Sequence, residues 1–150
     1  MITRENVLDS LVPYFADERY VLLVCDMGFA KIDRLKQMYP KRVINCGIAE
    51  QGTVGMASGM AEAGLIPVVY SIAAFLVYRA LEQIRNDIVL RRKNVKLIGN
   101  GSGNFFKHLG ECHRCGTVDI SLMSLVGVPV YDGSCFNDWI RSERAGYFRC

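Results

Sequence analysis

The chain has 150 residues, of which 51% are hydrophobic and 22% are charged. This size and composition predict one folded domain over residues 1–150 with a substantial core, and they exclude a disordered chain. The formal net charge is only +3, and the basic residues are scattered apart from the run at 91–93. Because no basic stripe could follow a phosphate backbone, we expect no nucleic-acid partner.

The chain starts with MITRENVLDSL, which is polar and then amphipathic, so we expect no signal peptide. The longest apolar stretch, residues 63–77, contains Pro67 and is too short to span a bilayer. These features predict a cytoplasmic protein with no membrane contact. In that compartment the six cysteines are expected to be reduced thiols.

Short apolar runs of strand type alternate with amphipathic helical segments along the chain. The predicted order is helix 4–17, strand 20–25, helix 32–39, strand 42–46, helix 49–62, strand 67–71, helix 74–91, strand 95–100, a glycine-rich loop to about residue 116, helix 118–126, a last strand at 129–132 and a short helix at 135–145. This alternation predicts the α/β class, a mostly parallel sheet flanked by helices on both faces. Sites in such sheets lie at the carboxyl ends of the strands.

One strand-to-helix junction is unusual, the segment VINCGIAEQG at residues 43–52. A strand ends at Gly47, and Glu50 follows in the first turn of a helix that also contains Gly52, Gly55 and Gly59. Each glycine costs about 1 kcal/mol in a helix interior. Glycines at this spacing predict a flat helix face for close packing. Packing against the chain's own sheet and packing in an oligomer interface are both open.

Residues 42–88 resemble the pyrimidine-binding domain of transketolase-like thiamine diphosphate enzymes. The likeness lies in the GIAEQ box, the small-residue helix after it, and a helix with the pattern F-x-x-x-R-A-x-E-Q-I-R. The segments VCDMG upstream and NVKLIGNGSG and DISLMSLVGVPVYDG downstream extend it over nearly the whole chain. The resemblance implies the thiamine diphosphate-binding fold.

In the family that it resembles, the GIAEQ glutamate hydrogen-bonds N1′ of the cofactor's aminopyrimidine. That contact favours the imino tautomer, which takes the proton from C2 of the thiazolium. The resemblance therefore implies that Glu50 is both catalytic and cofactor-binding, with the carbanion chemistry supplied by the cofactor. Taken alone, Glu50 could also be an ordinary first-turn glutamate that interacts with the helix dipole.

Aromatic residues follow the third predicted strand. The resemblance implies that Phe75 stacks on the aminopyrimidine, since stacking holds a flat heterocycle in its plane. Tyr78, one turn later, would add to this wall or face the substrate, and Ile48 with Ala49 would shape the pocket floor. The alternative for both aromatics is an ordinary core position. Four polar residues of the same helix are expected in an interface or in helix packing: Arg79, Glu82, Gln83 and Arg85.

The loop at residues 100–116 departs from the family pattern, in which a histidine before the next helix points at the substrate. His113 lies six residues before Asp119, where the family has five, so an exact register would place Arg114 there. A one-residue insertion is the simpler reading and makes His113 a catalytic and substrate-binding candidate. Asp26 and His108 are further candidates for substrate contact. A surface position is the alternative for both histidines.

Cys112, His113 and Cys115 form a C-H-x-C cluster. Zinc needs four ligands in a tetrahedral arrangement, and only a chance contact in the fold would supply the fourth. We therefore predict no metal site within this chain.

The family holds the cofactor's diphosphate and Mg²⁺ with a G-D-G motif and an asparagine in a different domain. Carboxylate and amide oxygens are suitable ligands for Mg²⁺, but the chain has no such motif, and YDGS at 131–134 lies in the wrong context. The chain also ends soon after the last predicted strand, where a transketolase would continue into a third domain. The absent motif thus predicts a cofactor shared with a diphosphate-binding-domain subunit. Together with the glycine face of the helix at 49–62, it predicts a heterotetramer with two copies of each subunit.

The expected activity is transfer of a two-carbon ketol unit from a keto sugar to an aldehyde, in carbohydrate metabolism. A subunit of a 2-oxo acid decarboxylase or dehydrogenase is the alternative within the same cofactor chemistry, although GIAEQ favours the transketolase side. A non-catalytic interaction subunit of the same fold is a third reading. A plain nucleotide binder is disfavoured because no G-x-G-x-x-G or P-loop follows the first strand. The donor and the acceptor stay open.

Overall fold

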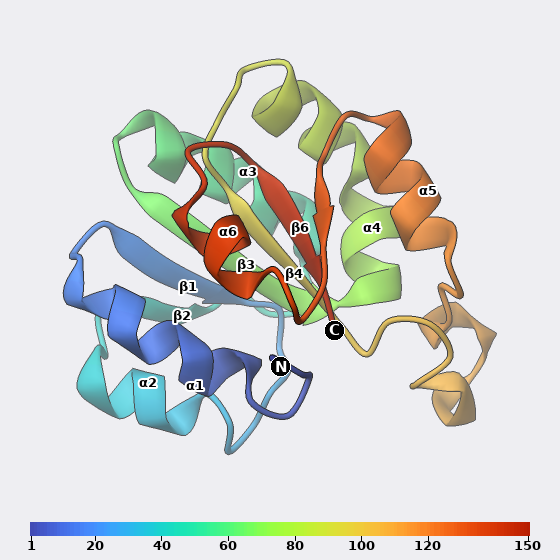
Figure 1. The fold of residues 1–150 in the computed structure, drawn as a ribbon, viewed down its shortest axis with the longest axis horizontal. Helices are drawn as coiled ribbons and strands as arrows, with labels where there is room; N and C mark the ends of the chain where they lie inside the picture. The colour runs from blue at the N-terminus through green and yellow to red at the C-terminus, as the bar shows by residue number, and fades with distance from the viewer.

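The computed structural model describes residues 1–150 and contains one six-stranded sheet (Figure 1). The strands are β1 (Tyr20–Val24), β2 (Val43–Asn45), β3 (Ile66–Ile72), β4 (Lys96–Asn100), β5 (Val130–Tyr131) and β6 (Gly146–Arg149). Their order across the sheet is β2-β1-β3-β4-β6-β5, and every neighbouring pair is parallel. The predicted α/β class with a parallel sheet is confirmed.

Most predicted helices form close to their expected bounds. The α-helices are α1 (Val7–Leu11), α2 (Asp33–Met38), α3 (Glu50–Glu62), α4 (Ala73–Gln83), α5 (Val118–Leu125) and α6 (Phe136–Arg141). The predicted helix 4–17 continues from α1 into the 3-10 helix η1 (Val12–Ala16), and the helix 74–91 continues from α4 into the π-helix η2 (Ile84–Val89). Two 3-10 turns, η3 (Lys107–Leu109) and η4 (Glu111–His113), lie in the glycine-rich loop. None of the helices combines the length and the apolar character needed to cross a membrane.

Helices cover both faces of the sheet, and each face has its own core (Figure 1). Leu22 and Val24 of β1 pack into the core that α1, α2 and α6 share, whereas Val21 and Leu23 pack into the core beneath α3, α4 and α5. All five residues of β1 are buried. This is the behaviour expected of a continuous apolar run in a parallel sheet that is covered on both faces.

The strand predicted at residues 129–132 forms as β5, but it is not the last strand of the chain. β6 follows α6 and inserts between β4 and β5. Its sequence, GYFR, is a weak strand signal because glycine and a charged residue flank only two aromatics. Gly146 is nevertheless required, since a Cβ there would lie 2.8 Å from Cδ1 of Trp139. The residue that weakens the sequence signal is therefore the one that permits the packing.

Lys96, the first residue of β4, is fully buried. Its Nζ donates to the Oγ and the carbonyl oxygen of Ser142 at 2.7 Å each, and to the carbonyl oxygen of Arg144 at 2.8 Å. These three oxygens satisfy the ammonium group, but burial lowers the pKa of Lys96 to about 7. Between pH 7 and the ordinary lysine pKa of 10.5, the unfolded chain therefore keeps the proton of Lys96 that the folded chain has released.

A folded-state pKa below the unfolded value means that stability rises with pH across the interval between them. We expect the free energy of unfolding to gain about 2 kcal/mol from Lys96 between pH 7 and pH 9. Urea unfolding at the two pH values measures this gain. Lys96→Met should lose it, whereas Lys93→Met, which removes a lysine paired with Glu62 at the surface, should keep it. An equal gain in Lys96→Met would contradict the assignment.

Candidate active site

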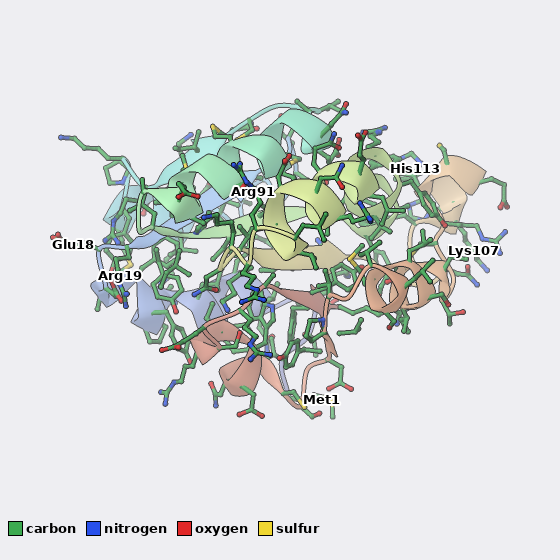
Figure 2. The ribbon with its side chains drawn as sticks, turned by 90° about the horizontal axis from the view of Figure 1, so that it is seen from above. Met1, Glu18, Arg19, Arg91, Lys107 and His113 are labelled. Atoms are coloured by element: carbon green, nitrogen blue, oxygen red, sulfur yellow. The ribbon has the colours of Figure 1, made fainter.

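The carboxyl ends of the parallel strands lie at one edge of the sheet, and the predicted site residues come from the segments at that edge. Figure 2 shows His113 and Lys107, which lie in the loop after β4, at the opposite end of the molecule from Glu18 and Arg19, which precede β1. This is the edge where parallel α/β sheets place their sites.

Asn45 joins the ends of β1 and β2. Its Oδ1 accepts the backbone N–H groups of Asp26 at 3.1 Å and Gly47 at 3.0 Å, and its Nδ2 donates to Oδ1 of Asp26 at 3.1 Å. Gly47 has φ +71°, which favours glycine. These bonds fix the turn that leads into α3. Asp26, a predicted substrate contact, is exposed at this edge and is held by Asn45.

Glu50 is the first residue of α3 and is only 2% exposed. Ser71 donates its Oγ–H to Oε1 at 3.0 Å, and Arg79 donates from Nη1 to Oε2 at 2.8 Å. Both carboxylate oxygens therefore have a partner, and the arginine compensates the buried charge. The position at the start of a helix also favours a negative charge. The carboxylate is thus paired, held in one orientation and shielded from water.

Phe75 is half-buried near the start of α4 and contacts two side chains of the site. The Arg79 guanidinium carbon lies 3.9 Å from the centre of its ring. The ring of His113 lies 4.7 Å away, centre to centre, with the two planes at 62°. Glu50, Arg79, Phe75 and His113 therefore form one continuous cluster.

The loop after β4 carries His113, not Arg114, to Phe75. The guanidinium of Arg114 donates instead to Glu111, at 2.6 and 2.7 Å, and to Asn104 at 3.1 Å. This geometry fits the one-residue insertion that the sequence suggested.

The base of this loop is closed by hydrogen bonds. The N–H groups of Cys115 and Gly116 donate to the Gly103 carbonyl oxygen, and Arg149 donates from Nη2 to the Gly116 carbonyl oxygen at 2.6 Å. Cys115 is buried, and burial raises the pKa of its thiol. The exposed Cys112 has its Sγ 3.2 Å from Nδ1 of His113. No three His, Cys, Asp or Glu side chains of the chain are grouped so that they could hold a metal ion.

The other predicted site residues lie less centrally. Tyr78 is 47% exposed and borders a surface hollow of about 520 Å³ together with Gln51 and Glu82. Ile48 is 71% exposed, so it forms no pocket floor in the single chain. His108 is exposed and packs near Phe106, with no contact to the cluster around Glu50. The structure thus joins Glu50, Phe75 and His113, but not Ile48 or His108.

The glycine face of α3 is open. A Cβ at Gly52, Gly55 or Gly59 would meet no other atom within 4 Å. The idea that these glycines pack against the chain's own sheet is therefore wrong, because Val54 and Ala57 of the same helix make that contact. The other alternative, an oligomer interface, stays a prediction.

Comparison with known families decides what this cluster belongs to. The family model described as "Transketolase, pyrimidine binding domain" matches residues 12–125, which include the whole cluster. The chain belongs to this family.

Two curated relatives of the pyrimidine-binding domain are named as transketolase subunits. The 6-deoxy-6-sulfo-D-fructose transketolase subunit SqwH of Clostridium sp. is 33% identical over 132 residues, which cover 86% of this chain and 41% of that protein. An apulose-4-phosphate transketolase subunit of Actinobacillus succinogenes is 39% identical over 105 residues, which cover 70% of this chain and 31% of that protein. The chain therefore spans less than half the length of these relatives.

Solved structures agree with this membership. A structure titled "Split gene transketolase, inactive beta4 tetramer" superposes on 97% of this chain and 49% of its own, with a TM-score of 0.79 and 26% sequence identity. The transketolase of Campylobacter jejuni covers 98% of this chain and 25% of its own, with a TM-score of 0.81. Because the sequence identity is only 16%, this second superposition shows the common fold alone.

Proposed function

We propose that this chain is the pyrimidine-binding part of a split thiamine diphosphate-dependent transketolase. The observation that carries the proposal is the buried Glu50 carboxylate beside the Phe75 ring, at the carboxyl edge of the sheet. Membership of the pyrimidine-binding family supports it, as do relatives that are named subunits.

The residues present fit an aminopyrimidine. A carboxylate kept from water accepts a hydrogen bond from a protonated ring nitrogen, and an aromatic face supports a flat heterocycle. Glu50 would hold the proton at N1′, Ser71 would orient the carboxylate, and Phe75 would fix the plane of the ring. When bound, the cofactor supplies the carbanion chemistry that breaks and forms the carbon–carbon bond.

His113 and Tyr78 would act on the substrate side of the ring. The His113 imidazole packs against Phe75, so it lies beside the proposed cofactor plane and can donate to a substrate oxygen there. Tyr78 presents an exposed ring one turn further along α4. By their names, two relatives act on a sulfonated ketose and on a sugar phosphate. A keto sugar donor and an aldehyde acceptor are therefore the proposed substrates.

The diphosphate and its Mg²⁺ would be held by a second subunit. This chain has neither the family's G-D-G motif nor a cluster of side chains that could hold a metal ion. The open glycine face of α3 offers a flat surface for a helix of another subunit. We propose two copies of each subunit, assembled as a heterotetramer around this face.

Calorimetric titration of thiamine diphosphate with Mg²⁺ tests the proposal. The chain alone should give no saturable heat below millimolar cofactor. A mixture with a subunit that carries the diphosphate-binding domain should bind with a dissociation constant in the micromolar range, since both halves of the site are then present. Tight binding by the chain alone, or none by the mixture, would contradict the split site.

A further inference from the structure

Arg79 contacts both groups that the proposed function assigns to the cofactor ring. Its Nη1 lies 2.8 Å from Oε2 of Glu50, and its guanidinium carbon lies 3.9 Å from the centre of the Phe75 ring. The sequence pattern suggested only an interface or helix-packing role for this residue. The inference drawn from this arrangement rests on the proposed function.

The guanidinium and an aminopyrimidine share the features that these two contacts recognise. Both are flat, both present N–H donors in their plane, and both can lie over an aromatic face while donating to a carboxylate. A guanidinium that stacks on Phe75 and donates to Glu50 therefore makes the pair of contacts that an aminopyrimidine would make.

The remaining recognition surfaces nearby are also occupied. Oε1 of Glu50 accepts the Ser71 hydroxyl at 3.0 Å, and the His113 ring packs against Phe75 at 4.7 Å. A cofactor ring cannot reach both Oε2 and the Phe75 face that Arg79 covers while the guanidinium stays in place.

We infer that Arg79 takes the place of the aminopyrimidine in the cofactor-free chain and swings out when the cofactor binds. Until then it compensates the buried Glu50 carboxylate, which would otherwise lie uncompensated away from water. Its side chain is 43% exposed, so it can leave without unpacking the core.

Glu82 can receive the displaced arginine. It lies three residues after Arg79, on the same face of α4, and both side chains border the same surface hollow. Glu82 is exposed and makes no salt bridge in this structure. Arg79 thus has two carboxylates within reach, one used without the cofactor and one available with it.

The test is cofactor affinity, measured by calorimetry with thiamine diphosphate and Mg²⁺ on mixtures of this chain with the diphosphate-binding subunit. Wild type is compared with Arg79→Leu and Arg79→Lys. If the guanidinium must leave first, only the wild-type molecules in which it has left can bind the cofactor. The measured affinity of wild type is then reduced by that fraction. Arg79→Leu should then bind on the order of tenfold more tightly. Arg79→Lys, which keeps the charge but loses the flat plane, should also bind more tightly, by a smaller factor. Arg34→Leu removes an exposed arginine of α2, on the other face of the sheet, that donates to Asp9, and should bind like wild type.

A second readout needs neither the partner nor the cofactor. Arg79→Ala should lower the unfolding temperature of the chain alone, and low-millimolar methylguanidinium should restore it by entering the vacated place. Arg34→Ala should show no such rescue.

The outcomes separate the two claims. A wild-type mixture that binds no cofactor overturns the proposed function. The role of Arg79 alone is overturned if the wild-type mixture binds the cofactor, Arg79→Leu and Arg79→Lys bind it equally or more weakly, and Arg79→Ala is not rescued. If Arg79→Leu does not fold, the affinity of Arg79→Lys decides.

Discussion

Glu50→Gln is expected to remove turnover by the reconstituted enzyme while cofactor binding stays measurable. Glutamine keeps the size of the side chain and one oxygen acceptor, but it cannot share a proton with a ring nitrogen. Loss of a positioned proton-transfer group lowers kcat by roughly 10²- to 10⁴-fold. Steady-state ketol transfer with the partner subunit measures kcat, and calorimetry measures the affinity for thiamine diphosphate.

Glu62→Gln is the matched control for this variant. Glu62 ends the same helix, is 65% exposed, and pairs with Lys93 at the surface. Its substitution should leave kcat and cofactor affinity unchanged within a factor of about two, since exposed ion pairs contribute little. Should Glu50→Gln keep more than one tenth of the wild-type kcat, Glu50 would not be the group that moves the proton.

The sheet could be predicted from the sequence wherever a strand is a continuous apolar run. β1 and β3 are such runs, they are buried along almost their whole length, and their predicted bounds are close to the observed ones. β6 was missed because its core contribution rests on Tyr147 and Phe148 alone, two residues between a glycine and an arginine. The change from an α-helix to a π-helix at Ile84 also has no signal in the hydrophobic pattern.

The site could be predicted only in part. Glu50, Phe75 and His113, which the structure brings together, were named as candidates because they lie in or beside short motifs that resemble a family. Ser71 was not assigned a role, Arg79 was given an interface or helix-packing role without its contacts to Glu50 and Phe75, and Asn45 was missed. Their partners lie 21, 29 and 19 residues away along the chain, so only the packing of different elements brings each pair together. A serine at the end of a strand and an arginine one turn after Phe75 were the available signals, and neither specifies a partner.

The buried pair of Asp119 and Arg149 gives the largest expected effect on stability. Asp119 lies in the first turn of α5 and is fully buried, and its Oδ2 accepts from Nε of Arg149 at 2.9 Å and from the Tyr147 hydroxyl at 2.8 Å. Its Oδ1 has no hydrogen-bond partner. Arg149→Met would leave this carboxylate buried, without its arginine and short of one donor. We expect a loss of roughly 3–5 kcal/mol in the free energy of unfolding, measured by urea denaturation.

Two comparisons separate the buried charge from simple loss of packing. The double variant Asp119→Leu, Arg149→Met should regain part of the loss, because it removes the uncompensated charge as well. Arg114→Met removes a half-buried arginine of the loop before α5, whose partner Glu111 is 83% exposed, and should cost less than about 1 kcal/mol. A cost as small for Arg149→Met would mean that Tyr147 alone compensates Asp119.

Because Arg149 also holds the Gly116 carbonyl oxygen, its loss should free the loop and separate His113 from Phe75. NMR spectra of Arg149→Met, recorded at a temperature where the variant is still folded, measure this separation. A weaker nuclear Overhauser effect between the ring protons of His113 and Phe75 would link the stability of the Asp119–Arg149 pair to the geometry of the site.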